Sequence, residues 1–133
     1  GVAVGRRQRY QEFYQQDRPR YRRIPRGTCA DAGYVPITTS GACEAAARAL
    51  RVRLTRATFA EASSVLGRPE GCYVFNNSND KSTTLWLGVN PRNEGNGAEG
   101  AQLGGQMPRQ PLCMSKVVAA KLAPSPPFAH LTQ

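Results

Sequence analysis

The sequence predicts an α+β fold, in which a short helix is linked by a disulfide to a small antiparallel sheet, with extended arms at both ends. Three observations support this fold class. An alanine-rich segment has helical periodicity, two runs of β-forming residues flank a polar loop, and the four cysteines bracket all of these segments. A domain of this size has a small apolar core and would gain stability from cross-links.

Composition and charge divide the 133-residue chain into three parts. Residues 1–27 form an arm rich in arginine and tyrosine, residues 28–113 form the disulfide-stabilised domain, and residues 114–133 form a proline-rich arm. The net charge is +9, and residues 1–26 contribute eight arginines to it against two acidic side chains. The first arm is therefore strongly basic and suits an acidic partner surface.

The helix is predicted over residues 42–53, because alanine and arginine favour helices. Thr39 or Ser40 would cap its first turn. Apolar side chains recur along the segment at the spacing of one helical face. They are Cys43, Ala46, Ala47, Leu50 and Leu54.

The clearest strands are predicted at residues 71–75 and 84–89, which would form a hairpin around a polar loop. Alternation places two sets of side chains on opposite faces: Cys72, Val74, Leu85 and Leu87 on one, and Tyr73, Phe75 and Trp86 on the other. Since both faces are apolar, we expect one to pack on the helix. An arm or a partner would then cover the other face.

The remaining segments are less regular. Residues 33–38 are predicted as an edge strand or a loop, because Pro36 interrupts the β-forming run. Residues 55–67 favour a short helix over a strand, and residues 90–111 favour a long irregular loop. Residues 117–122 have the pattern of one or two helical turns.

The four cysteines predict two disulfides, because their number is even and none is paired closely in the chain as zinc ligands usually are. Four cysteines allow three pairings. We favour Cys43 with Cys72, which would tie the helix to the hairpin, and Cys29 with Cys113, which would close the ends of the domain. Free buried thiols in a reducing compartment are the alternative. Disulfides imply an oxidising compartment.

The sequence offers no catalytic set, so we predict no enzymatic activity, no metal and no cofactor of the protein's own. The single histidine, His130, lies in the proline-rich arm, and the glutamates show no spacing typical of a catalytic carboxylate pair. Residues 95–100 match the G-x-G-x-x-G pattern, but a dinucleotide site also needs a preceding strand and a following helix. A loop is the better interpretation.

The arms are the predicted partner-binding parts, because arginine and tyrosine are both favoured at protein interfaces. The residues that we expect to bind a protein partner are Arg6, Arg7, Arg9, Tyr10, Tyr14, Arg20, Tyr21, Arg22, Arg23 and Phe128. Nucleic acid is not expected, because it is scarce in oxidising compartments. No apolar run is long enough to span a bilayer, so we expect membrane contact to be peripheral at most.

Several short motifs occur in a fixed order between Cys29 and Cys113: YVPITT at 34–39, CEAA at 43–46, RPEGCY at 68–73, LWL at 85–87 and PLC at 111–113. In this order they resemble a four-cysteine module that is abundant in predicted proteins of dinoflagellate algae. The layout is also distantly similar to PAN/apple-type domains, in which a helix is linked to an antiparallel sheet. The glycine-rich residues 91–107 and both arms depart from the common module.

The resemblance implies a structural role for the protein, and it implies no catalytic activity. In such algae, small disulfide-bearing proteins can be recruited as extra subunits of photosynthetic complexes. We therefore expect a non-enzymatic accessory subunit of a photosystem–antenna supercomplex in the thylakoid lumen of the chloroplast. Its arms would clamp neighbouring subunits, and it could touch neighbouring pigments or lipids.

The residues themselves also support two alternative functions. The first is an extracellular carbohydrate-binding module, in which Tyr73 and Trp86 would stack on a sugar. The second is an RNA-binding accessory protein of a ribosome, in which the arginines would contact phosphates and the tyrosines would stack on unpaired bases.

Overall fold

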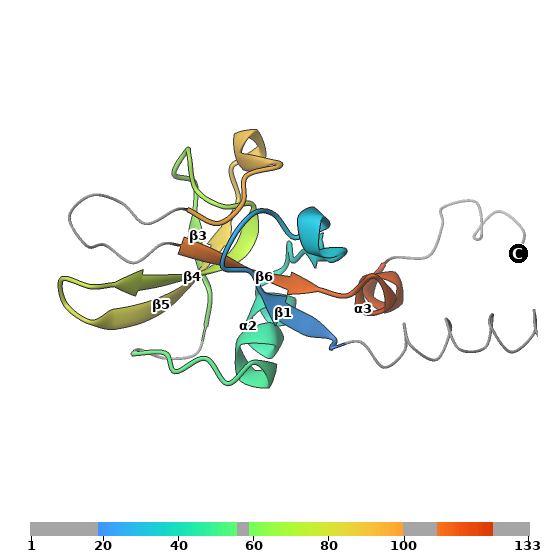
Figure 1. The fold of residues 1–133 in the computed structure, drawn as a ribbon, viewed down its shortest axis with the longest axis horizontal. Coiled ribbons are helices and arrows are strands. Elements are labelled where there is room, and N and C mark those ends of the chain that lie inside the picture. The colour runs from blue at the N-terminus through green and yellow to red at the C-terminus, as the bar shows by residue number, and fades with distance from the viewer. Residues whose placement is uncertain (1–18, 56–58, 100–108, 124–133) are drawn as a thin grey trace, which may run out of the picture.

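The computed structural model describes residues 19–55, 59–99 and 109–123 and has an α+β fold with two disulfides, as the sequence predicts (Figure 1). Its strands are β1 (Tyr21–Arg23), β2 (Val35–Pro36), β3 (Glu61–Ser63), β4 (Gly71–Asn77), β5 (Ser82–Gly88) and β6 (Arg109–Met114). Its helices are α2 (Ser40–Ala49) and α3 (Lys116–Leu122), with short 3-10 turns η1 (Ala30–Ala32) and η2 (Pro91–Asn93).

The six strands form one sheet in the order β1-β6-β4-β5-β3, and β2 also pairs with β6. The first half of β6 pairs with β4, and its second half lies between β1 and β2. All pairs are antiparallel except β3 with β5. Among the described residues, the last strand therefore holds the first two strands in place.

Helix α2 covers one face of the sheet. Its N-cap is Thr39, whose side-chain oxygen accepts a hydrogen bond from the Ala42 N–H at 3.3 Å. The side chains that join the main core from the helix and the sheet are Cys43, Ala46, Ala47, Cys72, Val74, Leu85, Leu87 and Leu112. The predicted apolar faces of the helix and the hairpin are therefore confirmed. The Cys43–Cys72 disulfide links the two elements, also as predicted.

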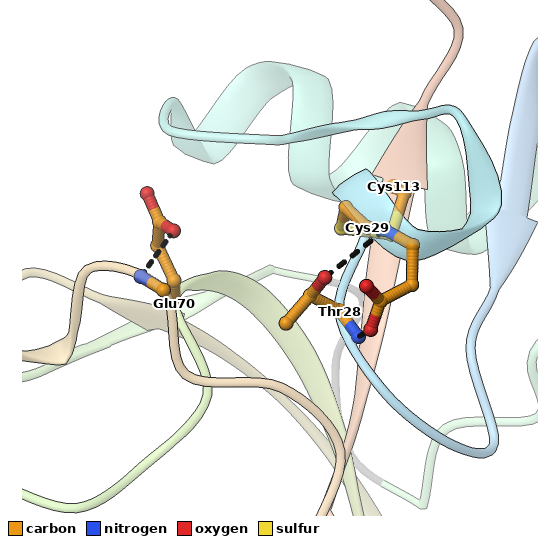
Figure 2. Close-up of a disulfide and its surroundings, with 6 residues drawn as sticks. Thr28, Cys29, Glu70 and Cys113 are labelled. Carbon is orange, nitrogen blue, oxygen red and sulfur yellow. Dashed lines mark hydrogen bonds between the residues drawn. A yellow bond between two sulfur atoms is a disulfide. The ribbon is translucent and has the colours of Figure 1, made fainter.

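The domain itself covers part of the opposite face of the sheet. A second small core forms there from Ile24, Cys29, Tyr34 and Cys113. The predicted Cys29–Cys113 disulfide lies within it and links the segment before η1 to β6 (Figure 2). Further along this face, the Arg109 guanidinium lies 3.9 Å from the centre of the Phe75 ring. Part of this face is thus covered by Ile24, which belongs to the predicted first arm, and part by residues of the domain itself.

Two predicted elements are wrong. The helix expected within residues 55–67 is replaced by β3, because the exposed edge of β5 offers parallel pairing for Glu61–Ser63. The loop expected over 90–111 is correct for residues 94–99, but Arg109–Met114 is a strand. The sheet also begins at Tyr21, inside the predicted first arm. By contrast, β2 is a short strand as expected, and α3 matches the predicted helical turns.

Gly71 begins β4 where the backbone leaves no room for a side chain. Its φ is 74°, and a Cβ there would lie 2.3 Å from the Ile37 carbonyl oxygen. That oxygen accepts a hydrogen bond from the Cys72 N–H at 2.9 Å, so it cannot move away without breaking this link. We expect Gly71→Ala to lower the free energy of unfolding by about 3 kcal/mol or more, which urea unfolding followed by the fluorescence of Trp86 would measure.

Gly67→Ala is the matched control for this substitution. Gly67 has a φ of 84°, but a Cβ there would meet nothing within 4 Å. The control therefore carries only the strain of a left-handed backbone, about 1–2 kcal/mol. Equal losses for the two variants would contradict the close approach of Gly71 to Ile37.

Candidate protein-binding surface

Four of the ten residues predicted to bind a partner lie in the part of the chain that the structure describes: Arg20, Tyr21, Arg22 and Arg23. The other six lie outside it, and they are Arg6, Arg7, Arg9, Tyr10, Tyr14 and Phe128. The candidate surface is therefore built from the segment that contains β1.

This segment is fixed along β6 by backbone hydrogen bonds. The Arg20 carbonyl oxygen accepts a bond from the Ser115 N–H at 2.8 Å, and the Ile24 N–H donates to the Pro111 carbonyl oxygen at 2.9 Å. Between them, Arg22 lies opposite Cys113 in the antiparallel ladder. Because β6 also pairs with β2 and β4, these bonds make residues 20–24 part of the sheet.

Hydrogen bonds near the second core hold the chain on both sides of this segment, at Pro19 and at Thr28. The buried hydroxyl of Tyr34 donates to the Pro19 carbonyl oxygen at 2.8 Å. On the other side, the Thr28 N–H donates to a carboxylate oxygen of Asp31 at 2.9 Å, and the Asp31 N–H donates back to the Thr28 hydroxyl at 3.0 Å (Figure 2). This reciprocal pair closes the turn that leads into Cys29.

Strand alternation separates the arginines into two kinds. Tyr21 and Arg23 lie on the α2 face, where Tyr21 packs against the main core. Arg23 is half-buried, and its Nε donates to the side-chain oxygen of Gln110. Burial lowers the pKa of Arg23. These two side chains therefore have contacts inside the domain, whereas Arg20 and Arg22 are exposed.

Arg26 extends the exposed set, although the sequence prediction did not include it. It borders a shallow hollow of about 440 Å³ together with Arg22, Ile24 and Asp31. Strand β1 ends at Arg23, so strand alternation does not place Arg26, and the sequence signal for it was only the high positive charge of residues 1–26. We call Arg20, Arg22 and Arg26 the arginine row.

No acidic side chain among the described residues forms an ion pair with the arginine row. Glu99 forms ion pairs with Arg109 at 3.0 Å and with Arg68 at 3.4 Å, and neither of these arginines belongs to the row. Asp31 lines the same hollow as Arg22 and Arg26, and its carboxylate keeps its negative charge while it accepts the bond from the Thr28 N–H. It forms no ion pair with either arginine, so the three side chains of the arginine row together present a net positive charge.

The aromatic residues considered for sugar binding do not form a stacking platform. Tyr73 is buried, with 2% of its surface exposed. Trp86 is half-buried, and its indole N–H donates to the Thr84 hydroxyl at 2.8 Å. The hollow beside Trp86, also lined by Phe59 and Glu61, measures about 130 Å³. Small-molecule sites are usually larger, roughly 300–1,000 Å³.

Residues 19–55, 59–99 and 109–123 contain no group of three or more His, Cys, Asp or Glu side chains placed to hold a metal ion. No helix within these residues combines the length and the apolar character needed to cross a bilayer. The chain matches no protein-family model, no curated protein and no solved structure. The function must therefore be inferred from the chain's own surface and motifs.

The two kinds of arginine should respond differently to truncation. Arg23→Ala removes a half-buried side chain and leaves Gln110 without its partner, so we expect it to lower the free energy of unfolding by about 1–2 kcal/mol. Arg22→Ala removes an exposed side chain and should change it by less than about 0.5 kcal/mol. Urea unfolding measures both, and a larger loss for Arg22→Ala would contradict the assignment.

Proposed function

We propose that the protein is a non-enzymatic accessory subunit that docks on an acidic surface of a larger protein assembly. The arginine row carries this proposal, because the sheet fixes the backbone at Arg20 and Arg22 and no described acidic side chain forms an ion pair with the row. A guanidinium gains most from a carboxylate that it can bind through two parallel hydrogen bonds. An acidic partner surface would provide such carboxylates.

The chemistry of the domain favours a protein partner over nucleic acid. The two disulfides point to an oxidising, non-cytosolic environment, in which nucleic acid is scarce. The sequence before the described segment adds Arg6, Arg7, Arg9 and Arg18 and no lysine. The planar guanidinium suits bidentate recognition of carboxylates as well as phosphates, so the preference for a protein partner rests on the disulfides.

The host of the subunit is proposed to be a photosystem–antenna supercomplex, with the thylakoid lumen as the oxidising compartment. The support for this host is the resemblance of the Cys29–Cys113 segment to the dinoflagellate module, together with the disulfides. Any contact with pigments or lipids would come from the position of the subunit in its host. An extracellular module is the competing location.

The test is incorporation of the full chain into its assembly. Tagged full-length protein is expressed in the cells that make it, and native complexes are separated without reductant. We expect the wild-type chain to migrate with a large assembly, and the variant R20E/R22E/R26E to be incorporated at least about tenfold less, because attraction becomes repulsion at three positions. Mass spectrometry of the wild-type complex identifies the host.

The variant R48E/R53E/R92E is the matched control. It changes the net charge by the same amount at three exposed arginines outside the arginine row. Incorporation of this control at the wild-type level, with loss of the other variant, would assign docking to the arginine row. Equal incorporation of all three proteins would overturn the proposal.

A truncation separates the contribution of residues 1–18. Removing them leaves β1 and the buried Ile24 in place, so the domain should keep its fold. A cut after residue 26 would instead remove a strand of the sheet and part of the second core. Circular dichroism of the shortened chain verifies the fold before its incorporation is measured.

A further inference from the structure

Strand β1 forms one edge of the sheet, and its outer side has free backbone groups. In an antiparallel ladder, residues alternate between pairs that are hydrogen-bonded and pairs that are not. The bonds at Arg20 and Ile24 show that the even-numbered residues face β6. The N–H and C=O groups of Tyr21 and Arg23 therefore point away from the sheet, and no described residue bonds them.

We propose that this edge is a docking strand, on which an extended acidic segment of the partner protein adds a further strand to the sheet. The inference rests on the proposed function and names the binding mode and the chemistry of the partner. Strand addition of this kind takes affinity from main-chain bonds and specificity from alternating side chains. Here the free groups of Tyr21 and Arg23 allow up to about four main-chain bonds.

The arginines beside the β1 edge favour an added strand that carries negative charge. Natural proteins often place charged side chains on edge strands to prevent unwanted pairing. Arginines repel a basic strand, but they attract an acidic one. The opposite edge of the sheet, β3, begins with the exposed Glu61 and therefore disfavours the same segment. An acidic segment consequently prefers β1 to β3.

The register of β1 defines the spacing of the acidic residues. Arg20 and Arg22 are two residues apart, so their side chains lie on the same face, on the side of Cys113 and the second core. Side chains directly opposite each other in a sheet lie about 4.5–5.5 Å apart at Cβ. A segment that pairs with both arginines therefore carries two carboxylates two residues apart.

The residue between the two carboxylates faces the other side of the sheet. There Tyr21 is half-buried against the main core, so an apolar side chain on the added strand would pack beside its ring. The fitting motif is acidic, apolar, acidic in an extended conformation. Pro25 follows the last bonded residue, Ile24, and keeps the docking strand short.

The probe is a soluble peptide of eight residues in which glutamate and valine alternate. Because recognition depends on main-chain bonds and charge spacing, we expect it to bind the full chain with a dissociation constant below about 1 mM. NMR titration should show the Tyr21 and Arg23 amides becoming protected from hydrogen exchange. A peptide of the same composition with its glutamates grouped at one end should bind at least about tenfold more weakly.

Methylation of alternate backbone nitrogens of the probe tests the pairing itself. In one pattern the methyl groups face β1 and remove its bonds, and in the other they face solvent. We expect binding to fall at least about tenfold for the first pattern only. Equal binding of both methylated peptides, or unchanged exchange at Tyr21 and Arg23 at saturation, would overturn strand addition.

Charge exchange provides the protein-side control. The variant R20E/R22E should no longer bind the glutamate peptide, and it should bind a peptide with lysine in place of glutamate. The strand edge is intact in this variant and only its charge has changed. Binding of neither peptide by a folded variant would overturn the inference. If the glutamate peptide fails while incorporation still depends on the arginine row, docking occurs without strand addition and the proposed function stands.

Discussion

Strand β6 pairs with β1, β2 and β4, and these three pairings join the two layers of the domain. Its Leu112 and Cys113 are both fully buried, one in each core, so the strand contributes to both faces of the sheet. Pro111 has no N–H to donate, and its carbonyl oxygen accepts the bond from Ile24. The ladder to β1 therefore ends at this proline. The arginine-rich segment is rigid only over the residues that β6 can bind.

The helix and the hairpin could be predicted because their signals are local. The cysteine pairs join residues that lie 29 and 84 positions apart, and they could be favoured only because they tie the predicted helix to the hairpin and close the ends of the domain. Strands β3 and β6 could not be predicted, because each is specified by a distant partner. The sequence of β3 has no strong β preference, and Pro111 makes β6 look like the end of a domain. The basic character of the candidate surface was visible in the sequence. The division between the half-buried Arg23 and the exposed Arg22 was not, because it depends on which face of β1 meets α2.

Each disulfide secures a different layer of this small domain. Cys43–Cys72 joins α2 to the main core and closes a separation of 29 residues, whereas Cys29–Cys113 closes a separation of 84 residues on the opposite face. Cross-links of this kind contribute roughly 2–4 kcal/mol each, mainly by restricting the unfolded chain. The second one also anchors the turn beside β1. A sheet edge with net positive charge can therefore be kept in place by a core of modest size.

The charges beside β1 also discourage pairing between copies of the chain. Two β1 edges would bring arginines together, and like charges directly opposite each other destabilise a strand pair. The β3 edge of a second copy carries Glu61, but the next two residues are Ala62 and Ser63. It can therefore neutralise only one arginine, whereas a segment with two spaced carboxylates neutralises two. Selectivity follows from the number and spacing of the charges, because any extended chain can supply the main-chain bonds.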